Sequence, residues 1–222
     1  MFRAAIFDMD GTLVDSEMHW RRAEREVFGA LGIAITDDMA LATAPMSPRQ
    51  VTEHWYRLKP WRAPPLEEIE SAVITRVGEL MRGRARALPG VHEALSLCRA
   101  LGWRVGLASN SPEVLCRLVL RELAIDGEFA AVVSSDHVER GKPDPAIYLQ
   151  AARQLGVAPG ECLAFEDSAT GVRAARAAGM CVVAVPSAGQ DFAAPATPDL
   201  TLATLREFAR EHAATLWRIS QG

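Results

Sequence analysis

The sequence predicts an α/β fold: a doubly wound parallel sheet with a small α-helical domain inserted after its first strand. Short apolar runs of strand length recur along the chain, and stretches with helical spacing lie between them. One early interval instead holds several helical patterns and no apolar run of strand type. Apolar residues make up 49% of the chain and charged residues 23%, which excludes disordered, collagen-like and coiled-coil classes.

Five apolar runs are typical of strands that are buried on both faces. None of them alternates polar with apolar residues, as a strand with one face in water would. Runs of this kind indicate a parallel sheet that is covered by helices on both sides. They are Ala4–Phe7, Val105–Ala108, Ala130–Val133, Cys162–Phe165 and Cys181–Val185.

Three helices are expected between the strands, outside the early helical interval. The first carries an apolar stripe from Val91 to Leu101, between Pro89-Gly90 and Gly102. The second covers Asp144–Leu155 and ends at Gly156. The third begins at Ser168, which is a good N-cap, and stops at Gly179.

The interval from Asp15 to Leu88 predicts a helical domain of about 70 residues. Ser16 is expected to cap a helix that runs to Leu31, and Val51–Leu58 and Ile69–Met81 are two more helical segments. Three tryptophans of this interval, Trp20, Trp55 and Trp61, are expected to form its core. The predicted domains are therefore 1–15 with 88–222, and 16–87.

Charge and hydropathy limit the classes of partner. A net charge of −4 gives no general attraction to nucleic acid or anionic lipid, so neither is an expected partner. No apolar run reaches the ~20 residues of a membrane span, and Asp8 interrupts the N-terminal apolar stretch. We expect a cytoplasmic monomer. The cysteines form no C-x-x-C pair and are expected to be buried apolar residues: Cys98, Cys116, Cys162 and Cys181.

Polar motifs follow four of the expected strands. They are Asp8-Met9-Asp10-Gly11-Thr12, Ser109-Asn110-Ser111, Gly141-Lys142-Pro143 and Glu166-Asp167-Ser168. Because ligands bind beyond the carboxyl ends of parallel strands, we expect these motifs to lie around one crevice. Four carboxylates with only one lysine near them would repel one another strongly unless they took up protons or a divalent cation lay among them. Such oxygen ligands favour Mg²⁺.

Each motif taken alone has an ordinary structural explanation. Asp8 and Asp10 could belong to a solvated turn, and Ser109 could simply end a strand. Lys142 could be a surface lysine, and Asp167 with Ser168 could cap the next helix. The joint arrangement is much less expected by chance than any one part, which favours a functional site.

The four motifs resemble, in order and across the whole chain, those of the haloacid dehalogenase superfamily. Within it, the sequence is similar to the sugar-phosphate phosphatases and β-phosphoglucomutases. The resemblance implies a Rossmann-like core, a small α-helical cap and Mg²⁺-dependent hydrolysis of small sugar or sugar-alcohol phosphates. The stretch from His54 to Trp61 resembles the cap of enzymes that act on 2-deoxyglucose 6-phosphate and hexitol phosphates.

The resemblance also implies a role for each motif. Asp8 would be the nucleophile that forms an aspartyl phosphate, and Asp10 would be the general acid and then the general base. The phosphoryl group would be bound by Thr12, Ser109, the backbone of Asn110 and Lys142, and Arg49 would contact substrate from the cap. Magnesium would be held by Asp8, Asp10, Glu166 and Asp167.

Two other activities share part of this set of motifs. A β-phosphoglucomutase-like enzyme would use the same Asp8 intermediate but return the phosphoryl group to a sugar rather than to water. A phospho-accepting receiver domain also combines paired acids, a hydroxyl and a lysine on a doubly wound sheet. The helical insertion and the late Glu166-Asp167 pair argue against a receiver domain.

Overall fold

The computed structural model describes residues 1–44, 46–186, 192, 194 and 196–220. They form two compact units: a core unit of Met1–Asp15 with Arg86–Gly222, and a helical unit of Ser16–Ala85. The boundary predicted after residue 87 lies two residues beyond the division in the structure. Among the described residues, no helix has the length and apolar character needed to span a bilayer.

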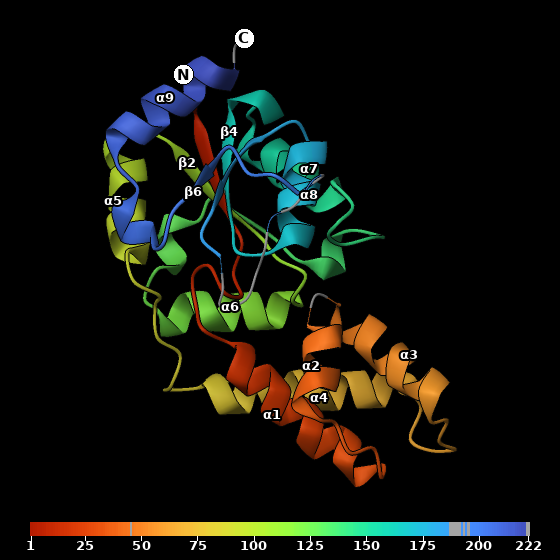
Figure 1. Cartoon of the computed structure of the whole chain (residues 1–222). Helices are drawn as coiled ribbons and strands as arrows, with labels where there is room; N and C mark the ends of the chain where they lie inside the picture. Colours follow the sequence, from red (N-terminus) through yellow and green to blue (C-terminus); the bar gives the residue numbers. More distant parts are fainter. Residues whose placement is uncertain (45, 187–191, 193, 195, 221–222) are drawn as a thin grey trace. The chain divides into compact units, whose positions relative to one another are not determined.

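The core unit is built on a parallel sheet whose six described strands lie in the order β3-β2-β1-β4-β5-β6 (Figure 1). The predicted doubly wound fold is therefore confirmed. The sixth strand was not predicted because its two residues, one half-buried and one exposed, form no apolar run. The strands are β1 Ala4–Phe7, β2 Arg104–Ala108, β3 Ala131–Val133, β4 Cys162–Glu166, β5 Cys181–Ala184 and β6 Leu200–Thr201.

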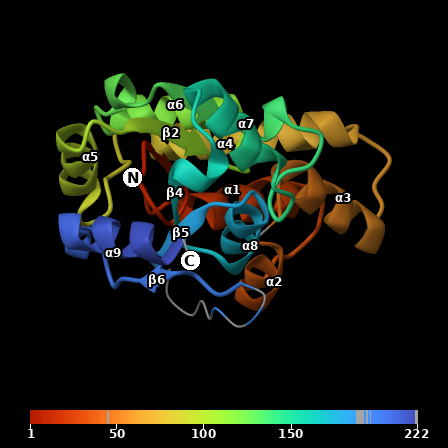
Figure 2. The same ribbon diagram turned by 90° about the horizontal axis from the view of Figure 1, so that it is seen from above.

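Helices cover both faces of this sheet, with α7 and α8 on one face and α5 and α9 on the other (Figures 1 and 2). The three predicted helices of the core correspond to α5, α7 and α8, whereas α6 and α9 were not predicted. The helices are α5 Val91–Ala100, α6 Glu113–Glu122, α7 Ala146–Leu155, α8 Ala169–Ala177 and α9 Arg210–Ser220. Single 3₁₀ turns lie at η1 Asp126–Glu128, η2 Ser135–His137, η3 Pro159–Glu161 and η4 Leu205–Glu207.

The sheet is apolar on both faces because successive side chains of a strand point to opposite sides. On one face Ile6 packs in a buried cluster with residues of α7 and α8. On the other, the ring of Phe7 stacks on that of Phe165 with 4.5 Å between centroids, and Phe165 meets the edge of Phe208. This burial on both sides explains why the strand sequences do not alternate.

The helical unit consists of α1 Glu17–Ala30, α2 Asp37–Thr43, α3 Pro48–Leu58 and α4 Leu66–Met81. Its core includes the buried side chains of Phe28 and Trp55, and Phe28 also contacts the ring of Trp61. The predicted N-cap at Ser16 is wrong in one respect: its side chain makes no capping hydrogen bond. Ser16 has helical rather than extended backbone angles, φ −103° and ψ −10°, and N-cap residues have non-helical angles.

The four cysteines are buried and form no disulfide. Burial raises the pKa of three of these thiols to about 12, so they stay protonated at neutral pH: Cys98, Cys162 and Cys181.

Gly90 lies at the start of α5, against the backbone of Arg206, and its replacement should lower stability. Its φ is +94°, and a Cβ there would lie 1.8 Å from the backbone nitrogen of Arg206. We expect Gly90→Ala to lower the free energy of unfolding by roughly 3 kcal/mol or more, measured by urea denaturation.

Gly102→Ala is the matched control for that substitution. Gly102 follows the same helix with φ +70°, but a Cβ there meets no described heavy atom within 4 Å. Only backbone strain of about 1–2 kcal/mol is expected. Equal losses in the two variants would contradict the contact that we describe at Arg206.

Candidate active site

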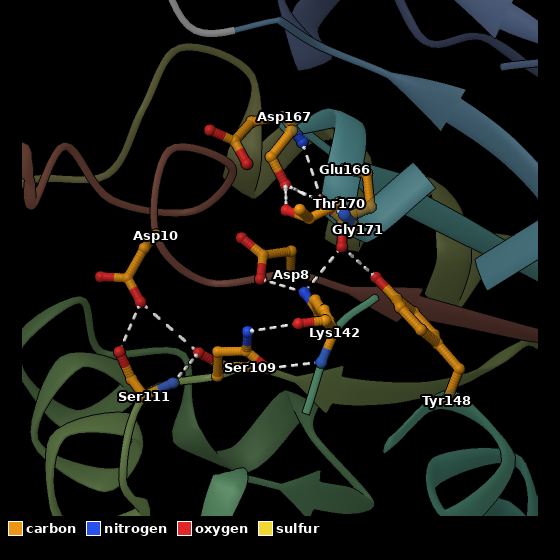
Figure 3. Close-up of polar contacts among 12 residues, drawn as sticks. Asp8, Asp10, Ser109, Ser111, Lys142, Tyr148, Glu166, Asp167, Thr170 and Gly171 are labelled. Carbon is orange, nitrogen blue, oxygen red and sulfur yellow. Dashed lines mark hydrogen bonds and ion pairs between the residues drawn. The ribbon is translucent and has the colours of Figure 1, made fainter. Parts of the chain in front are cut away.

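The strand register brings the first and last motifs side by side. Neighbouring strands β1 and β4 pair Phe7 with Phe165, so the next residues, Asp8 just after β1 and Glu166 at the end of β4, lie side by side. Strand β2 flanks β1 on the other side and is followed by Ser109. The chain therefore places all of these side chains at the carboxyl edge of the sheet (Figure 3).

Lys142 lies between two carboxylates. Its ammonium donates to Asp8 Oδ1 and, over 2.6 Å, to Glu166 Oε1. All three side chains are more than nine-tenths buried. Lys142 is thus held inside the site and is not a surface residue.

The carboxylate of Glu166 accepts hydrogen bonds on both oxygens. Besides Lys142, Oε1 accepts from the hydroxyl of Tyr148 over 2.5 Å. Oε2 accepts from the backbone N–H of Asp167 over 3.2 Å and from the hydroxyl of Ser168 over 3.3 Å. A carboxylate offers about four lone-pair sites, so protein donors already use the acceptor capacity of Glu166.

Burial and neighbouring charge shift the proton affinities of this cluster. Burial raises the pKa of Asp8 well above its usual range; Lys142 opposes this rise, while Glu166 and the aspartates add to it. Burial acts to lower the pKa of Lys142, but Asp8 and Glu166 outweigh it and raise that pKa, so the ammonium stays charged. One ammonium among several acids leaves the site short of positive charge.

Asp10 is turned toward the motif that follows β2 (Figure 3). Its Oδ2 accepts from the hydroxyl of Ser111 over 2.7 Å and from that of Ser109 over 3.4 Å. The backbone N–H of Ser111 in turn donates to Ser109 Oγ over 3.0 Å. The two hydroxyls therefore hold the Asp10 carboxylate in a defined orientation.

The side chain of Asn110 binds the backbone of Lys142. Asn110 Oδ1 accepts from the Lys142 N–H over 2.8 Å, and Asn110 Nδ2 donates to the Lys142 carbonyl over 3.2 Å. Gly141 leaves room for this contact, because a Cβ there would lie 2.3 Å from Asn110 Oδ1. The motif after β2 thus fixes the loop that carries the lysine.

Three of the acids are arranged so that they could hold a hard cation. One oxygen from each of Asp8, Glu166 and Asp167 lies within 4.8 Å of the other two. Carboxylate oxygens are the ligands that Mg²⁺ prefers, and the site lacks positive charge, so the donor set fits this ion. Because the oxygens of Glu166 are occupied by protein donors, Asp8 and Asp167 are the better direct ligands.

Among the described residues, no hydrogen bond or ion pair links Thr12 or Arg49 to the cluster around Lys142. Thr12 is buried, and its hydroxyl has no hydrogen-bond partner among the described residues. Arg49, at the start of α3, pairs over 3.1 Å with Glu53 on the exposed side of the helical unit. The binding roles of both residues stay predictions.

Comparison with known proteins agrees with this geometry. The sequence matches the family described as haloacid dehalogenase-like hydrolase over residues 2–179. The chain belongs to the haloacid dehalogenase-like hydrolase family. It is 41% identical over 185 residues to hexitol phosphatase B of Escherichia coli, covering 83% of each protein. It is 32% identical to a phosphorylated carbohydrates phosphatase of Thermotoga maritima, covering 80% of this chain and 82% of that protein.

A solved structure also resembles the chain closely. CbbY of Rhodobacter sphaeroides, crystallised in complex with phosphate, superimposes with a TM-score of 0.86 at 29% identity. The match covers 93% of this chain and 96% of CbbY.

Three residues of the candidate site had no role predicted from the sequence. Ser111 binds Asp10, Tyr148 binds Glu166, and Gly171 lies against the Glu166 carboxylate. The available signals were a second hydroxyl in the motif after β2, a tyrosine on an apolar helix face and a glycine inside a helical pattern. None of these signals alone indicates a site.

Proposed function

We propose that the protein is a Mg²⁺-dependent phosphatase that hydrolyses small sugar or sugar-alcohol phosphates through an aspartyl phosphate on Asp8. The observation that carries the proposal is the buried Asp8 carboxylate beside the Lys142 ammonium at the carboxyl end of the central strand. The similarity to phosphatases of hexitols and phosphorylated carbohydrates supports the substrate class.

In the first step, an oxygen of Asp8 attacks phosphorus, and the bond between phosphorus and the sugar oxygen breaks. Asp10 donates a proton to the departing oxygen. Lys142 and Ser109 stabilise the phosphoryl oxygens as their charge redistributes, and the amide after Ser109 adds a further donor. Because Lys142 is held at its backbone and at its ammonium, it needs little reorganisation to bind the phosphoryl oxygens.

In the second step, water attacks the phosphorus of the aspartyl phosphate and Asp10 accepts its proton. Inorganic phosphate leaves, and Asp8 regains its carboxylate. Ser111 holds Asp10 by one carboxylate oxygen, Oδ2, over 2.7 Å, so the single hydroxyl proton of Ser109 is available to the phosphoryl oxygens. The carboxylate therefore keeps one orientation while it donates a proton in the first step and accepts one in the second.

When bound, Mg²⁺ would supply positive charge that offsets repulsion between the acids and the phosphoryl oxygens. Asp8 and Asp167 would hold it with the backbone carbonyl of Asp10, while Glu166 adds negative charge nearby.

A substrate panel tests this proposal. We expect phosphate release from hexitol phosphates and 2-deoxyglucose 6-phosphate in MgCl₂, and a loss of at least ~100-fold in excess EDTA that added Mg²⁺ restores. A colorimetric phosphate assay measures both. Full activity in EDTA would contradict the metal, and isomerisation of β-glucose 1-phosphate without phosphate release, followed by ³¹P NMR, would indicate a mutase instead.

A further inference from the structure

Tyr148 lies on α7, outside all four motifs, and its side chain is fully buried. Its hydroxyl donates to Glu166 Oε1, the same oxygen that accepts from the Lys142 ammonium (Figure 3). We propose that Tyr148 is a positioning residue, which fixes the carboxylate of Glu166 and, through it, the ammonium of Lys142 beside Asp8. This inference rests on the proposed function, because it concerns the lysine that would bind the phosphoryl group.

The geometry gives the tyrosine hydroxyl a specific task. The two donors on Oε2, the Asp167 N–H and the Ser168 hydroxyl, bind one edge of the Glu166 carboxylate. On the opposite edge, Oε1 has Lys142 and Tyr148. Without the tyrosine hydroxyl, Lys142 would be the one remaining donor to Oε1. The Oε1 edge of the carboxylate would then be held less firmly, and the Lys142 ammonium that binds it would be less well positioned.

The ring of Tyr148 has a separate contact from its hydroxyl. Lys142 Nζ lies 5.2 Å from the ring centroid, within the range of a cation–π contact. Tyr148→Phe keeps this ring and removes only the oxygen. If Tyr148 merely filled the core, this substitution would change stability and leave the ammonium of Lys142 in place.

The composition offers a direct view of Lys142. Of the 24 basic residues only Lys59 and Lys142 are lysines, and the only tyrosines are Tyr56 and Tyr148. Protein carrying ¹⁵N in its lysine side chains therefore contains only two labelled ammonium groups. Lys59 is an internal reference, and Tyr56→Phe removes the same atom at the partly exposed tyrosine of α3.

The first measurement needs no substrate. We expect the buried Lys142 ammonium of the wild type to exchange its protons slowly, because it is closed off from water by its partners. Tyr148→Phe should shift the ¹⁵N signal of Lys142 and speed this exchange about tenfold. The signal of Lys59 should not move, and Tyr56→Phe should leave both signals unchanged.

The second measurement is kinetic, on the best substrate of the panel at 25 °C. Tyr148→Phe should lower kcat about tenfold and change KM less than about threefold, as expected when an interaction of the transition state is weakened. Thermal melting followed by circular dichroism shows that the variant is folded at that temperature. Tyr56→Phe should keep the wild-type kcat.

Two results would overturn the positioning role: an unchanged Lys142 signal in Tyr148→Phe, or a kcat within about twofold of wild type. A lower melting temperature with unchanged kcat would assign the hydroxyl to stability alone and also overturn it. Failure of the proposed function is a different result, in which wild-type protein with Mg²⁺ hydrolyses no member of the panel. The NMR experiment would still report whether Tyr148 positions Lys142.

Discussion

Asp8→Asn should abolish turnover, with a loss of at least about 10⁴-fold in kcat. An amide is nearly the same size as the carboxylate but is a poor nucleophile, so the aspartyl phosphate cannot form. Glu166 still holds Lys142 over 2.6 Å, and we therefore expect the variant to fold. The measurement is phosphate release at saturating substrate, together with circular dichroism.

A matched control is Asp38→Asn, which makes the same chemical change at an exposed position of α2. It should keep wild-type kcat. A residual activity of one tenth or more in Asp8→Asn would contradict the nucleophile assignment.

A single-turnover experiment in ¹⁸O-labelled water separates the proposed route from direct attack by water. Wild-type enzyme rapidly quenched after mixing with substrate should carry one phosphoryl group on Asp8, detected by mass spectrometry of its peptide. Released phosphate should contain ¹⁸O, because water attacks phosphorus, and Asp8 itself should not. Label in the carboxylate of Asp8 would instead indicate attack of water on the carbonyl carbon.

The sheet and most of its helices could be predicted because their causes are local in the sequence. A parallel strand that is buried on both faces must be apolar throughout, so Ala4–Phe7 and Cys162–Phe165 are visible as runs. The positions of the motif residues Asp8 and Lys142 are also predictable from the sequence around them. A polar residue at the end of such a strand, or in a loop between Gly141 and Pro143, is placed by the backbone next to it.

The contacts within the site depend on residues that are far apart in sequence. The sequence pattern of α7 places Tyr148 on a buried face of that helix, whereas Glu166 lies at the end of strand β4. No regular spacing in the sequence predicts a contact between these two residues. Asn110 is similar: its side chain binds the backbone of Lys142 across two loops. The motif resemblance implied a role for the backbone of Asn110 but none for its side chain.

The error at Ser16 has a different cause. The residue type is right for an N-cap, but capping also requires an extended backbone, which the chain does not adopt where it leaves the Asp8–Val14 loop. The backbone angles of a single residue are set by tertiary packing and are not visible in its identity.

Gly171→Ala is expected to have the second-largest effect on activity. Gly171 lies within α8, where a residue with no tertiary contact would favour alanine by about 1 kcal/mol. A Cβ at Gly171, however, would lie 1.9 Å from Glu166 Oε1 and 2.0 Å from Oε2. The Glu166 side chain is fully buried and bound on both oxygens, so it has no free space to enter.

Helix propensity and the steric clash therefore predict opposite signs, and the clash should win. We expect Gly171→Ala to lower the free energy of unfolding by roughly 2 kcal/mol, because overpacking in a filled core costs about 1–3 kcal/mol. The displaced carboxylate would also release the Lys142 ammonium, so kcat should fall by about 100-fold or more. Urea denaturation and steady-state kinetics at 25 °C measure the two effects.

Gly29→Ala is the matched control, because Gly29 lies in α1 and a Cβ there meets no described heavy atom within 4 Å. It should raise stability slightly and leave kcat unchanged. Wild-type kcat in Gly171→Ala would mean that the Glu166 carboxylate can move without consequence for Lys142. That result would contradict our inference that turnover requires a fixed Glu166 carboxylate.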